Sequence, residues 1–292
     1  MASSVNLLAE GIYFGEGPRW RDGRLWFSDF YSRRVMSVSP AGDLRAEVSI
    51  DDQPSGLGWL PDGSLLIVSM TKRQVLRRSP NGAIDTHADL GAIAGFHCND
   101  MVVDRDGWAY VGNFGFDLDA AIAAEGVAGV VAKHPTAKLA CVSPTGAVSV
   151  AATELHFPNG SVITPDGKTL IVAETLGGGL TAFSIAADHS LSDRRVWAPT
   201  GARVPDGIAL NADGAIWVAN ALAPECVLFA EGGAVLDVIE TGDPCYACML
   251  GGDDGRALFM LTAPSSNHAA AAASPQGKLL TTVVNAPRAG LP

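Results

Sequence analysis

Six Asp-Gly dipeptides recur at nearly regular intervals along this chain of 292 residues, and a seventh, Asp206-Gly207, falls outside this series. The six stand at Asp22-Gly23, Asp62-Gly63, Asp106-Gly107, Asp166-Gly167, Asp213-Gly214 and Asp254-Gly255, with steps of 40, 44, 60, 47 and 41 residues. Each is followed by a β-rich run, such as residues 65–68 (LLIV) or 170–172 (LIV). Because Asp and Gly tolerate the positive φ that tight turns need, each dipeptide predicts a β-hairpin.

A second turn marker follows most of these runs, usually as Ser-Pro-x-Gly. It stands at residues 39–42, 79–82, 143–146, 230–233 and 274–277, with a degenerate copy near residues 187–190. Two hairpins per repeat give four strands, so the chain is predicted to be all-β and to form a six-bladed β-propeller. A β-sandwich also has many short strands, but it does not repeat at a fixed period.

The whole chain, residues 1–292, is interpreted as a single propeller domain, because all-β folds of this size are often one domain. Residues 7–13 and 279–284 are expected to share one blade and so to close the ring. The tail over residues 285–292 is expected to fray. The longest step contains an insertion of about residues 115–138, in which Asp119 is placed to cap a short helix over residues 120–125. An insertion in one blade of a regular array is either a lid or a simple strand extension.

Charge and cysteine content narrow the possible partners. A net charge of −11 argues against a nucleic-acid partner. The chain has no apolar run long enough for a membrane helix and no secretory signal, so a cytoplasmic protein with reduced thiols is expected. Cys245 and Cys248 form a lone C-x-x-C pair, which we interpret as structural or incidental.

One position recurs at a fixed distance before the turns, and we call it the slot. It lies seven residues before the turn Asp in five repeats and six residues before it in the first. Its occupants are Glu16, Ser55, Asn99, Asn159, Asp206 and Ala247. Equal spacing places each slot at the start of an innermost strand, so all six are predicted to face one axis.

Four of the slots carry oxygen donors, namely Glu16, Asn99, Asn159 and Asp206. Two carboxylates buried together without a counter-charge are costly, and a divalent cation removes that cost. An all-oxygen donor set suits Ca²⁺, Mg²⁺ or Mn²⁺. The alternative is that Asx residues before Gly simply make turns.

The strand after each turn returns to the same rim of the channel. It ends on Asp29, Ser69, Asn113, Glu174, Asn220 and Thr262, which we call the strand-end residues. They are expected to orient ligands or to line a pocket.

Four motifs then resemble one family. They are GEGPRW at residues 15–20, Asn99-Asp100, FPNG at residues 157–160 and PDGI at residues 205–208. Together, in this order, they resemble the senescence marker protein, gluconolactonase and luciferin-regenerating enzyme family. The resemblance implies a catalytic divalent metal held by Glu16, Asn159 and Asp206, most often Ca²⁺ and in some members Zn²⁺, Mn²⁺ or Fe²⁺. It also implies that Asn99 contacts the substrate or completes the metal shell, and that Asp206 is the general base.

The residues around these motifs depart from a sugar-binding pattern. Family members that open sugar lactones carry an Arg two residues before Asn99, where this chain has His97. Asp117 matches a carboxylate that contacts sugar in some members. Phe114, Phe116 and the valine-rich insertion are less polar than a sugar site requires. His97, Asp117, Phe114, Phe116 and Asn99 are therefore predicted to contact a substrate less polar than gluconolactone.

The leading hypothesis is a metal-dependent hydrolase of a lactone or related cyclic ester, with Asp206, Asn99 and His97 in the chemistry. A phosphotriesterase that resembles diisopropylfluorophosphatase, a metal-dependent isomerase of an apolar natural product, and a non-catalytic propeller stay open. The only partner expected is a small-molecule substrate, and the protein is expected to be a monomer or a small homo-oligomer. The Gly-x-Ser-x-Gly motif, the phosphate-binding loop and the dinucleotide fingerprint are absent from the sequence.

Overall fold

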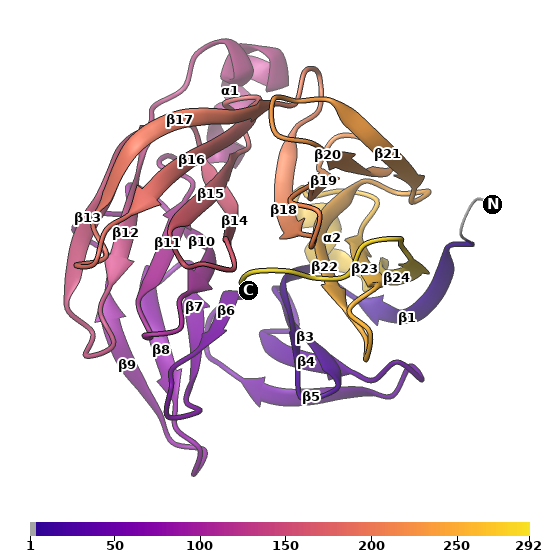
Figure 1. Cartoon of the computed structure of the whole chain (residues 1–292), viewed down its shortest axis with the longest axis horizontal. Coiled ribbons are helices and arrows are strands. Elements are labelled where there is room, and N and C mark those ends of the chain that lie inside the picture. The colour runs from indigo at the N-terminus through magenta and orange to yellow at the C-terminus, as the bar shows by residue number, and fades with distance from the viewer. Residues whose placement is uncertain (1–3) are drawn as a thin grey trace.

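The computed structural model describes residues 4–292, and its strands form six four-stranded antiparallel sheets set around an axis (Figure 1). The prediction of a six-bladed β-propeller is confirmed. The innermost strands are β2 (Gly15–Arg21), β6 (Pro54–Trp59), β10 (Cys98–Val103), β14 (Pro158–Ile163), β18 (Pro205–Leu210) and β22 (Cys245–Gly251). The second strands are β3 (Arg24–Asp29), β7 (Leu65–Ser69), β11 (Ala109–Asn113), β15 (Thr169–Glu174), β19 (Ile216–Asn220) and β23 (Ala257–Thr262).

In the first five blades the second turn marker lies between the two outer strands, and in the sixth it precedes the third strand. The third strands are β4 (Arg34–Val38), β8 (Gln74–Arg78), β12 (Ala137–Val142), β16 (Gly179–Ile185), β20 (Glu225–Phe229) and β24 (Gly277–Val283). The outermost strands are β5 (Leu44–Ser49), β9 (Ile84–Asp89), β13 (Val148–Leu155), β17 (Leu191–Pro199), β21 (Val235–Glu240) and β1 (Asn6–Ile12). The sheets run in this order from the axis outward.

The turn chemistry explains why the hairpins form where the dipeptides stand. Gly63 has φ 84° and donates its N–H to Leu60 O at 2.9 Å, which closes the turn between β6 and β7. The degenerate marker in the fourth blade works without glycine, because His189 itself adopts φ 63°. Both kinds of hairpin therefore follow from residues that can reach the left-handed region.

The ring closes as expected, because β1 from the N-terminal end pairs with β24 from the C-terminal end in the sixth blade. Apolar residues fill the space between neighbouring sheets. Leu66 of β7 and Met101 of β10, for example, belong to one fully buried cluster between the second and third blades. This packing fixes the inner strands around the channel.

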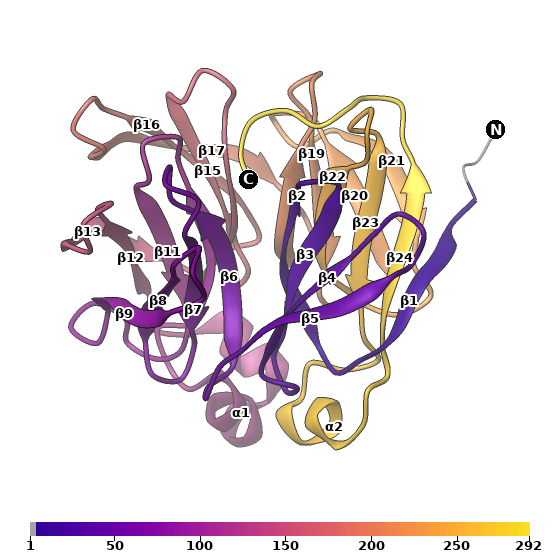
Figure 2. The same cartoon turned by 90° about the horizontal axis from the view of Figure 1, so that it is seen from below.

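The expectation that residues 285–292 fray is wrong. This segment, which we call the strap, crosses the end of the channel where the Asp-Gly turns lie (Figure 2). Arg288 N donates to Gly255 O of the sixth blade at 2.8 Å, and Ala289 N donates to Leu210 O of the fifth at 3.0 Å. Leu291 exchanges two backbone hydrogen bonds with Ile163 of the fourth blade. The strap is ordered because these neighbours satisfy its backbone groups.

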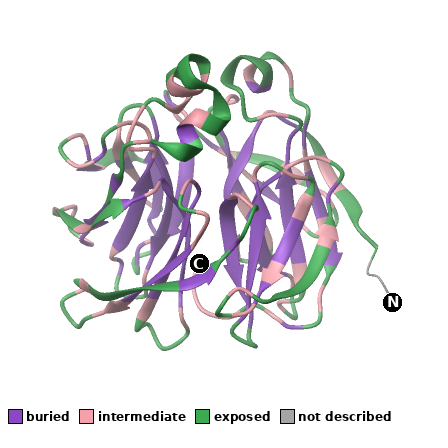
Figure 3. Ribbon diagram, turned by 90° about the horizontal axis from the view of Figure 1, so that it is seen from above, coloured by how far each residue is buried: buried purple, intermediate pink, exposed green. Residues whose placement is uncertain are grey.

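Two helices lie at the opposite end, α1 (Leu118–Ala132) and α2 (His268–Ala273) (Figures 2 and 3). Helix α1 lies within the predicted insertion but is longer than expected and is interrupted at Gly126. Its N-cap is Asp117, whose carboxylate accepts the Ala120 N–H, so the prediction of Asp119 as the cap is corrected by two residues. Within residues 4–292, no helix is long and apolar enough to cross a membrane.

Candidate metal centre in the channel

The slot residues lie at the end of the channel that carries the helices. In each blade the first residue of the inner strand pairs with the strand-end residue of the second strand. The next residue on the inner strand occupies the slot. Glu16, Asn99, Asn159 and Asp206 are 5%, 4%, 3% and 7% exposed. The structure therefore places all four predicted ligands at equivalent, buried positions near the axis.

The sixth slot differs from the prediction. Because Cys245 pairs with Thr262, register places Tyr246 at this position, not Ala247. The inner strand of this blade has seven residues where β6 has six, and the added residue shifts the count from the turn. Tyr246 is buried, and its pKa is raised to about 12, mainly by burial and also by the negative charges of Asp206 and Glu16. Tyr246 therefore lies beside both carboxylates, and sequence spacing missed it.

Glycines after the slots bring neighbouring inner strands close together. A Cβ at Gly160 would lie 2.6 Å from Asp206 O, and a Cβ at Gly207 would lie 2.7 Å from the Ala247 Cα. Neither distance admits a side chain. The glycine in PNGS and PDGI is therefore required by strand packing, and this packing brings Asn159 and Asp206 together.

The two buried carboxylates destabilise each other's charged forms. Burial raises the pKa of Glu16 well above its ordinary value, and the charges of Asp206 and Asp100 raise it further. Burial also raises the pKa of Asp206, with a further contribution from Asp100, while Asn159 lowers it. A cation between these groups would reverse the raised values.

Two oxygens in the site lack a partner. Among the described residues, six buried side-chain nitrogen or oxygen atoms have no hydrogen-bond partner, and these include Asn159 Oδ1 and Asp206 Oδ1. Asn159 Nδ2 donates to Thr175 Oγ1 at 3.1 Å, which leaves the amide oxygen free. Buried polar atoms are normally satisfied. These two oxygens and the nearby carboxylates fit a hard divalent cation.

Asn99 and its neighbour Asp100 have different surroundings. Asn99 Oδ1 accepts a long hydrogen bond of 3.5 Å from Ser55 Oγ. Asp100 is buried and forms an ion pair of 2.7 Å with Arg19, whose Nε also donates to Leu57 O at 2.9 Å. Arg19 therefore links the first three blades and compensates Asp100, which leaves the other two carboxylates without a cationic partner of their own.

The strand-end residues hold the backbone that leads into the slots. Asp29 Oδ1 accepts the Phe14 N–H at 2.9 Å, Glu174 Oε2 accepts the His156 N–H at 2.7 Å, and Asn220 Oδ1 accepts the Val204 N–H at 3.1 Å. These carboxylate and amide oxygens are thus engaged by the connecting segments. Their role in the structure is to position the start of the inner strand.

An apolar collar covers the slots. Phe14, Phe30, Met70, Tyr246, Ala263 and Ala271 form its buried cluster, with Tyr31, Phe114 and Ala221 packed against it. The rings of Phe14 and Tyr246 lie 4.6 Å apart, and those of Phe114 and Phe157 lie 4.4 Å apart. The sequence could have indicated Phe14 and Phe30. Phe14 stands two residues before the slot residue Glu16, and Phe30 directly follows the strand-end residue Asp29.

The remaining predicted contacts lie around this collar. His97 is half-buried and stacks on Phe96 with ring centroids 4.0 Å apart, and burial lowers its pKa. Phe116 packs against His134 of the insertion, with centroids 6.1 Å apart, and Asp117 caps α1. The contacts of Phe116 and Asp117 are thus with the insertion itself, and their contact with a substrate stays a prediction.

A separate acidic group lies at the other end of the molecule. Asp104, Asp106 and His189 place ligand atoms within 4.8 Å of one another. Asp104 Oδ1 already accepts the N–H groups of Asp106 and Trp108, so its carboxylate closes the turn between β10 and β11. None of the predicted slot ligands belongs to this group. Cys245 and Cys248 are buried free thiols, as expected.

The fold and site together define a class: a six-bladed propeller with converging acid and amide side chains at one end of its channel. Residues 14–264 match the family described as the SMP-30/Gluconolactonase/LRE-like region. The chain belongs to this family, and the resemblance drawn from its motifs is confirmed.

Individual relatives are distant but cover most of the chain. A pentonolactonase of Haloferax volcanii is 25% identical over 269 residues, which are 85% of this chain and 81% of that protein. A luciferin-regenerating enzyme superimposes with a TM-score of 0.83 at 17% identity, covering 99% of both chains. A calcium-binding protein, regucalcin, of Agrobacterium tumefaciens superimposes with a TM-score of 0.78 at 20% identity, covering 98% of this chain and 95% of that one.

Proposed function

We propose that this protein is a divalent-metal-dependent lactonase whose substrate is less polar than a simple sugar lactone. The observation that carries the proposal is the pair of unpartnered oxygens on Asn159 and Asp206, buried beside Glu16 and beneath an apolar collar. A lactonase activity agrees with the family and with the name of the pentonolactonase relative.

Glu16, Asn159 and Asp206 would hold the ion, with Asn99 as a fourth donor or as a contact to the substrate carbonyl. Ca²⁺ suits the oxygen donors best, with Mn²⁺, Mg²⁺, Zn²⁺ and Fe²⁺ as alternatives. When bound, the ion would polarise the lactone carbonyl, an effect worth several kcal/mol.

The side chains of the site carry out the proton transfers. Asp206 accepts a proton from the water that attacks the carbonyl carbon, and the ring C–O bond breaks as the proton passes to the leaving alkoxide. His97 stands two residues before Asn99, and its lowered pKa favours a neutral imidazole that can accept or relay a proton. Tyr246 occupies the slot of the sixth blade, between the blades that carry Asp206 and Glu16.

The collar supports the choice of substrate. Phe14, Phe30, Met70 and Phe114 belong to the apolar collar, beside which sugar hydroxyls would find few partners. Aliphatic or aryl lactones match this surface. The insertion with α1 lies at the same end and is proposed to act as a lid (Figure 3).

The test is a hydrolysis screen of aliphatic, aryl and sugar lactones, with an organophosphate triester included. Chelation with EDTA should remove the activity, and added Ca²⁺ or Mn²⁺ should restore it. Asp206→Asn should lower kcat about 10²–10⁴-fold, the range for a lost general base. Asp213→Asn, at the exposed turn of the same blade, is the matched control and should leave kcat unchanged. Full activity after EDTA treatment, or preference for the triester, would contradict the proposal.

A further inference from the structure

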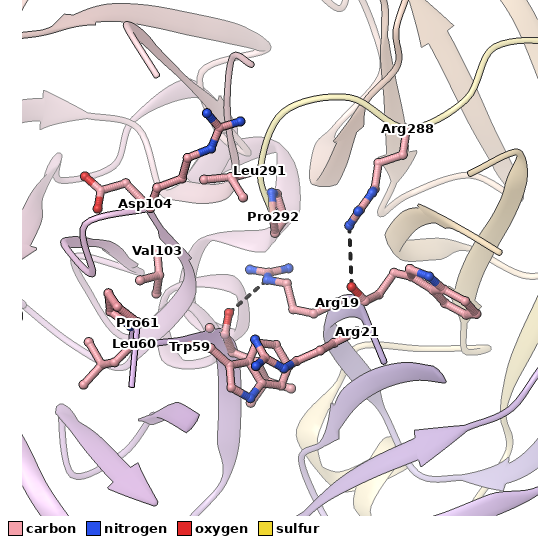
Figure 4. Close-up of a pocket in the computed structure, with 14 residues that line it drawn as sticks. Arg19, Arg21, Trp59, Leu60, Pro61, Val103, Asp104, Arg288, Leu291 and Pro292 are labelled. Atoms are coloured by element: carbon pink, nitrogen blue, oxygen red, sulfur yellow. Dashed lines mark hydrogen bonds between the residues drawn. The ribbon is translucent and has the colours of Figure 1, made fainter. Parts of the chain in front are cut away.

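A cavity of about 330 Å³ lies at the Asp-Gly end of the channel, opposite the candidate metal centre (Figure 4). The ends of β2, β6 and β10 form one side of it, and Arg288, Leu291 and Pro292 of the strap form the other. Its volume is at the lower end of the range for small-molecule sites. The strap thus turns an open channel end into a bounded pocket.

The charge of this cavity is opposite to that of the molecule. Its lining includes Arg19, Arg21, Arg105 and Arg288 but only one acidic side chain, that of Asp104. The chain as a whole carries a net charge of −11. A local excess of guanidinium groups in an acidic protein indicates selection of an anion at this place.

Two of these arginines have an acidic neighbour, and only Arg19 is compensated by it. Arg19 is buried and paired with Asp100, so it serves as the floor of the cavity. Arg21 lies 4.7 Å from the centre of the Trp59 ring, and its contact with Asp22 at 3.2 Å is exposed to solvent and therefore weak. Its guanidinium is thus held at the cavity wall by stacking.

The other two have no acidic partner. Among residues 4–292, no carboxylate forms an ion pair with Arg105 or Arg288. Arg288 Nη1 makes one long contact of 3.5 Å with Trp20 O, and partial burial lowers the pKa of its guanidinium. Asp104 does not compensate them, because its oxygens already face backbone N–H groups and His189.

The remaining walls are apolar. Trp20, Trp59, Leu57, Val103 and Leu291 line the cavity between the arginines. A fully hydrated inorganic ion gains little from such walls, whereas an organic anion buries its carbon against them. Arginine forks also match the planar geometry of a carboxylate.

We propose that this cavity is a second ligand site, which binds a small organic carboxylate through Arg105 and Arg288 and packs its carbon portion against Trp59 and Leu291. The site lies outside the proposed catalytic centre, and its existence does not depend on the proposed function.

Benzoate is a suitable probe, and titration calorimetry at low ionic strength is the measurement. Benzoate should bind the wild-type protein, whereas benzyl alcohol, which has a similar shape but no charge, should bind at least about tenfold more weakly. Arg105→Gln with Arg288→Gln should weaken benzoate binding by a similar factor, and high salt should weaken it further. The backbone bonds of Arg288 are retained in this variant, and its melting temperature verifies the fold.

Two control variants locate the binding. Arg195→Gln removes an exposed arginine paired with Glu231 on the outside of the fourth blade and should leave affinity unchanged. Asp206→Asn alters the other end of the channel and should also leave it unchanged. The proposal is overturned if benzoate does not bind, if the double glutamine variant binds it as tightly as the wild type, or if Asp206→Asn abolishes binding.

Discussion

At the scale of single residues, the candidate site depends on charges that the fold does not balance. Glu16 and Asp206 are buried near each other and near Asp100, and among residues 4–292 only Asp100 of these three has a cationic partner. A charged pair that lacks compensation lowers stability, and this is tolerated where a ligand supplies the missing charge. Under the proposed function, the same two residues would link the stability of the protein to metal binding.

This link predicts a pH dependence in chelator-treated protein. Both pKa values are raised in the folded state, so the folded protein binds these protons more tightly than the unfolded chain. The unfolding free energy should therefore fall as pH rises from about 4 through the raised values, by about 1.4 kcal/mol for each pKa unit. Urea unfolding at a series of pH values measures this decline.

The double variant Glu16→Gln with Asp206→Asn should lack the decline, and Asp213→Asn should keep it. Ca²⁺ at 100 times its Kd should add about 2.7 kcal/mol to the wild type at neutral pH and much less near pH 4, where protons compete for the ligands. An identical pH profile in wild type and double variant would refute this assignment.

At the scale of elements, Asp117 in the insertion has two possible roles, as a contact to the substrate and as the N-cap of α1. The family resemblance implies that Asp117 contacts the substrate, and the structure shows it capping α1 through Ala120 N at 3.0 Å. Asp117→Ala should cost about 1 kcal/mol of helix stability, because the cap is lost. Hydrogen exchange of the amides over residues 120–125 should then be about fivefold faster.

Asp117→Asn separates the two roles, since Asn caps as well as Asp but carries no charge. If Asp117 only caps, the Asn variant keeps the wild-type exchange rate and the wild-type KM. The Ala variant then has a faster exchange rate and a higher KM. A raised KM in the Asn variant with exchange unchanged would instead assign the carboxylate to the substrate.

The elements differed in how well sequence revealed them. All six hairpins and five of the six slots followed from Asp-Gly chemistry, because a turn at a fixed period constrains local backbone and fold together. Tyr246 was missed because one added residue in β22 shifted the count, and only strand register revealed it. Helix α2 was missed because it has six residues, although Asn267 before an alanine run is a capping signal. The Arg19–Asp100 pair joins residues 81 apart, and no local pattern encodes such a contact.

At the scale of the whole molecule, the two ends of the chain close the propeller in different ways. Strand β1 completes the sixth blade and pairs with the outer edge of β24 from Gly277 to Thr281. The strap adds backbone bonds to three blades but belongs to none of the four-stranded sheets. The repeating turns predicted the β1–β24 closure. The strap could not be predicted in this way, because it contacts residues of three blades that come together only in the assembled ring.

We propose that the whole chain unfolds as one cooperative unit held by the β1–β24 closure. A chain shortened to begin at Tyr13 should lose several kcal/mol of unfolding free energy, because the side chains under β1 become exposed and β24 becomes an open edge.

A chain lacking residues 285–292 is the control, because it is shortened by a similar length but keeps all six sheets complete. Its net loss should be smaller, since about 1 kcal/mol per hydrogen bond is offset by the entropy of ordering the strap. Urea unfolding compares the two, and light scattering should detect association only in the first. Equal losses of unfolding free energy in the two shortened chains would contradict this proposal. Two separate unfolding transitions in the full chain would also contradict it, because the ring would then not unfold as one unit.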